Sequence, residues 1–134
     1  MTQRINEHGQ PIGADLEGWV ARPRPPLTAL EGTYADVVPL RATTHGDALF
    51  AAFKTDKSGA MWTYMPNGPF DQRSDFDAFL SEAETSTDPL FYAIVNKSTS
   101  CAEGFASYLR IKPAVGVIEV GFIAMSPLLQ KTRV

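Results

Sequence analysis

The sequence predicts a mixed α/β domain of the α+β type, in which two helices precede an antiparallel meander of strands. Apolar residues recur at helical spacing over about residues 45–54 and 74–84, as on one face of an amphipathic helix. After Pro89 the apolar period changes to two, which is the period of a strand. Short turns join the three strands expected there, and such turns favour antiparallel neighbours.

Composition favours one globular domain. The chain has 134 residues, of which 44% are hydrophobic and 20% charged, enough to bury a sizeable core. No apolar run approaches the roughly 20 residues needed to cross a bilayer, and the polar residues 1–15 do not resemble a signal peptide. The single cysteine, Cys101, has no partner for an internal disulfide, so we expect a reducing compartment, the cytoplasm.

Charge is divided unevenly along the chain. The net charge of −3 makes no general case for nucleic acid or a membrane as a partner. Five basic and two acidic residues after position 90 leave residues 91–134 at +3, whereas residues 1–90 carry −6. This division suits an anionic cofactor and a cationic substrate, and it is equally compatible with chance. His8 and His45 lie far apart, with no Cys or His at ligand spacing, so no metal site is expected.

Residues 1–33 are predicted to form an extended, proline-rich arm. The run from Ala21 to Pro26 contains three prolines, a density that forbids a helix or a central strand. The arm either lies on the domain or leads into it. A proline-rich ligand for a recognition module is the alternative. The domain proper is expected to occupy residues 34–134.

The helical half of the domain has two predicted N-terminal signals. A short strand is expected over 34–40, closed by Pro39. Thr44 and Asp47 have capping-box spacing, and a helix over 45–54 should follow. Ser74 and Asp77 have the same spacing before the apolar stripe of a second helix, over 74–84. That stripe is formed by Phe76, Phe79, Leu80 and Ala83.

The second half of the domain is predicted to form three strands, over 90–96, 104–111 and 115–125. The first two are separated by the polar turn 96–100, and the last two by a turn at Pro113. Residues 115–125 are apolar at nearly every position. Such a run is typical of a central strand buried on both faces, and we expect that position for it.

Residues 117–134, from Val117 to Val134, resemble the fourth strand and cofactor loop of the GNAT-superfamily N-acetyltransferases. Gln130 matches the first position of the family's loop motif, and Arg133 stands where its first glycine is usual. The loop from Trp62 to Phe70 resembles the substrate-side loop of the RimJ/RimL-like branch. The resemblance runs over 34–134 and ends before the family's cofactor-binding helix, so we expect a GNAT-like domain that is truncated there.

The resemblance implies acetyl-CoA as the acyl donor. The backbone of Ile123, Ala124 and Met125 would bind the pantetheine arm as an added strand would. The pyrophosphate would lie on the loop that starts at Gln130. Backbone amides at the start of a helix form an anion cradle, here those of Lys131, Thr132, Arg133 and Val134, with two cationic side chains among them.

Glu119 is the predicted catalytic residue. A carboxylate on an otherwise apolar strand needs compensation, and in the resemblance it falls on the glutamate that takes the amine proton through water. Gly121, two residues on, is expected to leave room for substrate. The alternative is a structural ion pair between Glu119 and Arg110 or Lys112 across the hairpin.

The acceptor is predicted to be a primary amine, in a protein N-terminus or a small molecule. Trp62, Tyr64 and Phe70 are candidates to line its pocket, or they simply pack under the loop. Two functions follow: an acetyl-CoA-dependent N-acetyltransferase, or a non-catalytic GNAT-fold fragment that acts through self-association or partner binding. The exposed apolar edge expected for the fourth strand predicts a homo-oligomer, in its simplest form a dimer.

Overall fold

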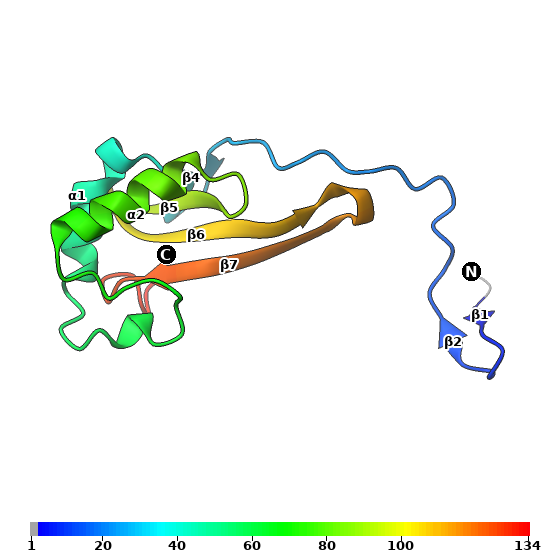
Figure 1. Ribbon diagram of the computed structural model, residues 1–134. Helices are drawn as coiled ribbons and strands as arrows, with labels where there is room; N and C mark the ends of the chain where they lie inside the picture. The colour runs from blue at the N-terminus through cyan, green and yellow to red at the C-terminus, as the bar shows by residue number, and fades with distance from the viewer. Residues whose placement is uncertain (1–2) are drawn as a thin grey trace.

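A five-stranded antiparallel sheet carries two helices on one face (Figure 1). The computed structural model describes residues 3–134. The strand order is β3-β4-β5-β6-β7, and a separate two-stranded ribbon, β1-β2, lies near the N-terminus. This architecture confirms the predicted mixed class. The elements are β1 Arg4–Ile5, β2 Pro11–Ile12, β3 Leu30–Glu31, β4 Ala35–Pro39, α1 Ala42–Phe53, the 3₁₀ turn η1 Ala60–Trp62, α2 Arg73–Thr85, β5 Leu90–Asn96, β6 Cys101–Lys112, the 3₁₀ turn η2 Pro113–Val115 and β7 Val117–Met125.

Helix α1 begins at Ala42, three residues before the predicted start, and the capping box predicted at Thr44 is wrong. No side chain of the preceding residue caps the helix. Instead the Ala42 N–H donates to the Glu84 carboxylate of α2 at 2.9 Å, and the Arg41 N–H donates to Nδ1 of His45 at 3.0 Å. The first amide of the helix is therefore satisfied by a charged acceptor from the neighbouring helix, and Thr44 lies inside α1 rather than at its cap.

Helix α2 confirms the predicted apolar stripe but not its capping box. Phe76, Leu80 and Ala83 are buried against the sheet. The residue before the helix makes no side-chain cap. Asp77, the predicted capping acid, accepts a hydrogen bond from Arg73 Nε at 2.7 Å. An arginine one turn away is a stronger partner for this carboxylate than a backbone amide.

The main core lies between the two helices and the sheet, and it is built from aromatic rings. Phe53 of α1 packs edge-on against Trp62 at 5.1 Å and against Phe105 of β6 at 5.5 Å between ring centroids. Phe76 and Phe105 are fully buried. Edge-to-face aromatic pairs add stability beyond the area that they bury, so this cluster fixes where the helices sit on the sheet.

Strand β7 is an edge strand, which confirms the exposed apolar edge expected for it, whereas the burial on both faces that its apolar run indicated is wrong. It pairs with β6 alone. Val117 is 50% exposed and Val120 is 60% exposed, because within residues 3–134 no further strand or helix covers this side. The strand begins at Val117 rather than 115, since Pro113–Val115 forms a 3₁₀ turn that Gly116 closes with φ of 64°.

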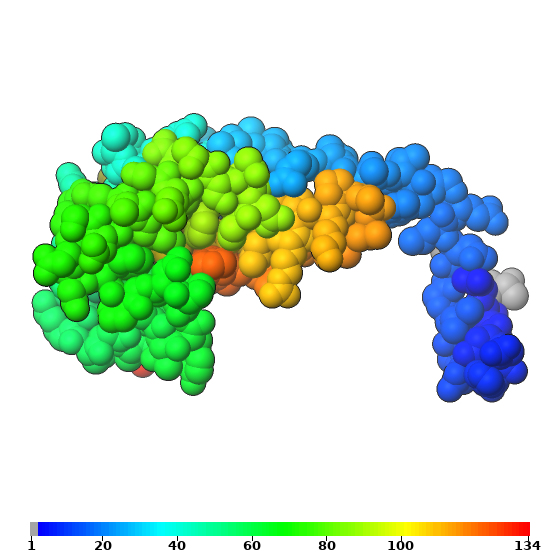
Figure 2. Space-filling model, in the orientation of Figure 1, coloured from blue at the N-terminus to red at the C-terminus, as the bar shows by residue number. Residues whose placement is uncertain are grey.

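The N-terminal arm lies against the tip of the β6–β7 hairpin. Trp19 Nε1 donates to the Ala114 carbonyl at 2.8 Å, and the Arg22 guanidinium stacks 4.6 Å from the Trp19 ring centre. Further along, the Tyr92 hydroxyl donates to the Pro26 carbonyl at 3.0 Å. Figure 2 shows the β1-β2 ribbon standing clear of the rest of the molecule. Neither this ribbon nor β3 was anticipated from the sequence.

Neither helix in the described range 3–134 combines the length and the apolar character that a membrane span requires.

Candidate functional site

A β-bulge interrupts β7 where the predicted cofactor strand should open. Ala124 pairs with Phe105 and Gly121 pairs with Ser107, so two residues of β7 face one residue of β6 in between. Phe122 adopts a positive φ of 49°, which is uncommon for a bulky residue and marks a constrained turn of the backbone. The bulge directs the Phe122 ring to the helix-covered face, 5.5 Å from Phe91 between centroids.

Of the three residues predicted to hold the pantetheine arm, Ile123 lies in the bulge, and Ala124 and Met125 follow it. Ile123 is 48% exposed, whereas Ala124 is buried in the main core. The Met125 carbonyl already accepts a hydrogen bond from Gln130 Nε2 at 2.9 Å. With β6 as the sole neighbour of β7 in the described chain, the outer edge of the strand keeps backbone groups free for an added chain.

The predicted pyrophosphate cradle, residues 130–134, is a series of turns. The Thr132 N–H donates to the Leu129 carbonyl at 3.1 Å, and the Val134 N–H donates to Thr132 Oγ1 at 3.2 Å. Lys131 has φ of 62°, in the left-handed region. Two of the four amides assigned to phosphate are therefore already bonded within this loop.

A cavity of about 470 Å³ lies beside this loop. It brings Arg133 together with Lys97 from the β5–β6 turn, and Tyr34 forms part of its wall. Arg133 stacks 5.6 Å from the Tyr34 ring centre. Lys97 pairs with Asp36 at 3.1 Å, and its hydrogen bond holds the pKa of that carboxyl below the usual value. The cavity thus presents two cations and several hydroxyls at the loop.

Glu119 forms the ion pair that was the alternative to a catalytic role. Its Oε2 lies 3.3 Å from Arg110 Nη1, with side chains 44% and 72% exposed respectively. Gly121 does not leave open space: a Cβ there would lie 2.8 Å from a methyl of Leu109 and 3.4 Å from Glu119 Oε1. The expectation that Gly121 makes room for substrate is therefore wrong, because the Leu109 side chain fills that position.

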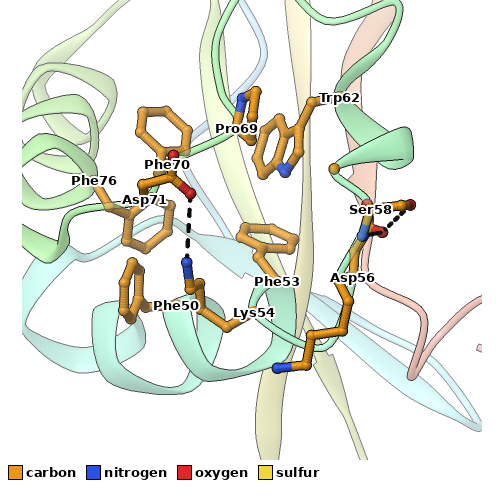
Figure 3. A pocket seen from close by; sticks show the side chains of 12 residues that line it. Phe50, Phe53, Lys54, Asp56, Ser58, Trp62, Pro69, Phe70, Asp71 and Phe76 are labelled. Atoms are coloured by element: carbon orange, nitrogen blue, oxygen red, sulfur yellow. Dashed lines mark hydrogen bonds and ion pairs between the residues drawn. The ribbon is translucent and has the colours of Figure 1, made fainter.

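The three aromatic residues predicted to line an acceptor pocket do not line one cavity. Trp62 and Phe70 share a cavity of about 390 Å³ with Phe53, Lys54 and Asp71 (Figure 3). The side chain of Lys54 pairs with Asp71 across it at 3.7 Å. Tyr64 is 98% exposed and is absent from this lining. No residue of β7 lines the cavity either, although the turn η1 that supplies Trp62 contacts β7.

A smaller cavity, of about 160 Å³, does reach β7. Phe122 forms one wall, and the rest comes from α2, the loops before and after it, and Phe91 of β5. This site was not predicted from the sequence, although helical spacing could have placed Phe79, Glu82 and Ala83 on one face of α2. Its lining residues are Asn67, Phe79, Glu82, Ala83, Ser86, Pro89, Phe91 and Phe122.

No cluster of three or more His, Cys, Asp or Glu suited to a metal ion occurs within residues 3–134.

Two solved structures resemble this chain closely. One is a GCN5-related N-acetyltransferase from Brucella melitensis, with 38% identity and a TM-score of 0.82 over 85% of this chain. The other is described as a probable acetyltransferase of the GNAT family from Chromobacterium violaceum, with 33% identity and a TM-score of 0.78 over 92% of this chain. A third structure, at 17% identity and a TM-score of 0.59, shares the fold alone.

The fold is that of the GNAT acetyltransferases. The chain spans 52% of the length of the Brucella protein and 62% of that of the Chromobacterium protein. A scan against protein-family models and a search of curated proteins each give no match.

Proposed function

We propose that this chain is part of an acetyl-CoA-dependent N-acetyltransferase that acylates a primary amine. The observation that carries the proposal is its likeness, at 38% and 33% identity over most of its length, to two structures described as GNAT acetyltransferases. The RimJ/RimL-like branch, suggested by the loop from Trp62 to Phe70, belongs to the same proposal. So does a cytoplasmic location, which the single exposed Cys101 favours.

Acetyl-CoA would lie along the outer edge of β7. An extended pantetheine arm carries amides that can pair with a free strand edge, as peptides do in β-augmentation. The position of β7 supports this role, because β6 is its sole neighbouring strand within residues 3–134 and its outer edge is open. Arg133 supplies positive charge for the phosphates beside the loop, and Lys97, which pairs with Asp36, lines the same cavity.

Glu119 would act as the general base. Only the neutral amine attacks the thioester, so the acceptor must lose a proton before or during attack. The ion pair with Arg110 is exposed on both sides, and such pairs are worth at most about 1 kcal/mol. Glu119 can therefore leave Arg110 when a substrate is present.

Binding of acetyl-CoA to the full chain tests the donor site. A ligand present at about 100 times its Kd stabilises the native state by about 2.7 kcal/mol, which thermal denaturation detects readily. Arg133→Ala should weaken this stabilisation. Arg4→Ala, which removes a charge on the distant β1-β2 ribbon, is the matched control and should leave it unchanged. Absence of any shift with acetyl-CoA would refute the donor site.

Turnover tests the base. In a full-length form of this protein that acetylates an amine, Glu119→Gln should reduce the rate by roughly 10²–10⁴-fold while acetyl-CoA affinity is retained. Arg110→Ala is the control, since it breaks the ion pair and keeps the carboxylate. Equal rates for wild type and Glu119→Gln between pH 6 and 9 would leave Glu119 with the structural role alone.

The alternative is a non-catalytic fragment that acts through self-association. Val117, Ile118, Val120 and Ile123 of β7 are each 46–60% exposed, and apolar edge strands favour pairing with another chain. We propose on this basis that copies of the chain associate, most simply as a two-fold dimer. Light scattering at tens of micromolar protein would decide, and a monomer would exclude this function.

A further inference from the structure

We propose that the small cavity between α2 and Phe122 binds the acceptor as a compact alkylammonium ion, with Glu82 as the residue that recognises its charge. The inference rests on the proposed N-acetyltransferase function and adds the cavity and the residue that would select its acceptor. This cavity is smaller than the Trp62 cavity, and a residue of the donor strand lines it, whereas none lines the Trp62 cavity.

The apolar part of the cavity is a wall of three rings. Phe79 and Phe91 meet edge-on at 5.9 Å, and Phe91 and Phe122 meet at 5.5 Å. The third ring is present only because the bulge in β7 directs Phe122 to this face. Aromatic faces attract cations through the ring quadrupole, so such a wall favours an ammonium group over a carboxylate or phosphate.

The polar part of the cavity carries one negative charge that the rest of the described chain does not neutralise. Glu82 is the sole ionisable residue of the lining. None of the ion pairs in residues 3–134 involves its carboxylate. Asn67 and Ser86 add an amide and a hydroxyl at the rim. A ligand with one positive charge and a few N–H donors matches this set.

The end of α2 adds to the negative potential. The helix runs from Arg73 to Thr85, and Ser86, which lines the cavity, is its C-terminal cap. No basic residue occupies its last turn. A helix C-terminus carries a partial negative charge that a cation complements. The helix C-terminus, the Glu82 carboxylate and the aromatic rings therefore all favour a positively charged ligand.

The position of the cavity fits transfer from the donor strand. Phe122 directly precedes Ile123, where the pantetheine arm is proposed to lie. Glu119 is three residues before Phe122 on the same strand, about 10 Å along it. Glu119 pairs with Leu109 of β6. The alternation of side chains along the two strands puts Glu119 on the same face of the sheet as Gly121 and Ala124. The volume of about 160 Å³ admits a head group and a short chain, and the remainder of a larger acceptor would extend into solvent.

A titration with n-butylammonium, followed by the amide resonances of the full chain, tests the site without acetyl-CoA. We expect shifts at Asn67, Glu82 and Phe122. 1-Butanol, which has nearly the same shape and no charge, should bind at least about fivefold more weakly. Equal binding of the alcohol, or shifts confined to the Trp62 cavity, would overturn the proposal.

Two variants of α2 isolate the charge. Glu82→Gln should weaken n-butylammonium binding about fivefold or more, and it keeps the shape of an exposed side chain, so folding is preserved. Asp75→Asn removes the same charge from the same helix outside the cavity, and it should change binding less than twofold. An equal loss of n-butylammonium affinity in both variants would show that the net charge of the chain, and not Glu82, governs binding. It would overturn the assignment to Glu82.

The outcome is separable from the fate of the proposed function. If acetyl-CoA binds and n-butylammonium does not, the acceptor site is wrong and the transferase proposal stands. If n-butylammonium binds at Glu82 and acetyl-CoA fails to bind, the cation site stands and the transferase proposal falls.

Discussion

The two faces of the sheet are packed very differently. On the helix-covered face, Phe76 and Phe105 are fully buried within a continuous set of aromatic contacts. On the other face a small cluster of Leu90, Tyr92 and Ile111 is crossed by the proline arm, and Val120 nearby is 60% exposed. The helix-covered face thus carries most of the stability, while the other face and the β7 edge keep surface free for contacts.

The largest expected difference between the faces comes from truncating a ring. Phe76→Ala should reduce the free energy of unfolding by about 3–5 kcal/mol, since it leaves a cavity in a packed core. Val120→Ala, on the exposed side, should change it by no more than about 0.5 kcal/mol. Urea denaturation followed by circular dichroism measures both. Similar losses would show that β7 is covered in solution.

A smaller effect should reveal how firmly the arm holds the open face. Tyr92→Phe removes the hydroxyl that donates to the Pro26 carbonyl and should cost about 0.5–1.5 kcal/mol of stability. Tyr64→Phe is the matched control, because that side chain is 98% exposed and makes no buried contact. If the two variants unfold alike, the arm does not dock on Tyr92.

A pH-dependent effect on stability is expected at the start of α1, where His45 is buried. Burial is the main cause that lowers the pKa of His45 below its ordinary 6.5, so the unfolded chain binds a proton on this residue more readily than the folded chain does. The stability contributed by neutral His45 is complete above about pH 6.5. It is lost as the pH falls from there toward the folded pKa.

Two histidine variants check this pH dependence. His45→Gln should flatten the slope of unfolding free energy against pH in that window. His8→Gln, which alters the exposed histidine of the ribbon, should leave the slope as it is. An unchanged slope in His45→Gln would show that His45 does not stabilise the start of α1 in its neutral form.

The smallest effect is expected at the hairpin that carries Glu119. Arg110→Ala and Glu119→Gln should each change stability by less than about 1 kcal/mol, and a double-mutant cycle should give a coupling of the same small size. A coupling of several kcal/mol would mean that the ion pair is a rigid structural element, which would remove Glu119 from the proposed chemistry.

The local pattern of apolar residues predicted most of the helices and strands. The stripe of Phe76, Leu80 and Ala83 and the strand Leu90–Asn96 follow from periodicity, which sequence shows directly. The start of α1 did not follow, because Glu84 of α2 caps α1 across the structure and a capping box considers local residues alone. The buried position assigned to β7 also failed, since apolar composition does not show which neighbours a strand has.

The candidate site was predicted in part. Glu119 and the strand from Ile123 to Met125 follow from the resemblance, and their roles stay predictions. Gly121 was assigned an open space that Leu109 fills, a contact between strands that the sequence does not reveal. The Phe122 cavity depends on a β-bulge, and the alternation of residues along a strand gives no sign of one when both faces are apolar.

The docking of the arm can be followed by the intrinsic fluorescence of the chain. Of its two tryptophans, Trp62 is 5% exposed within the aromatic core, whereas Trp19 is 39% exposed at the hairpin tip. The fluorescence of Trp62 should therefore report global unfolding. That of Trp19, which stacks with Arg22, should respond to release of the arm while the core stays intact. Acrylamide quenching of Trp62→Phe and Trp19→Phe variants would record the two motions separately.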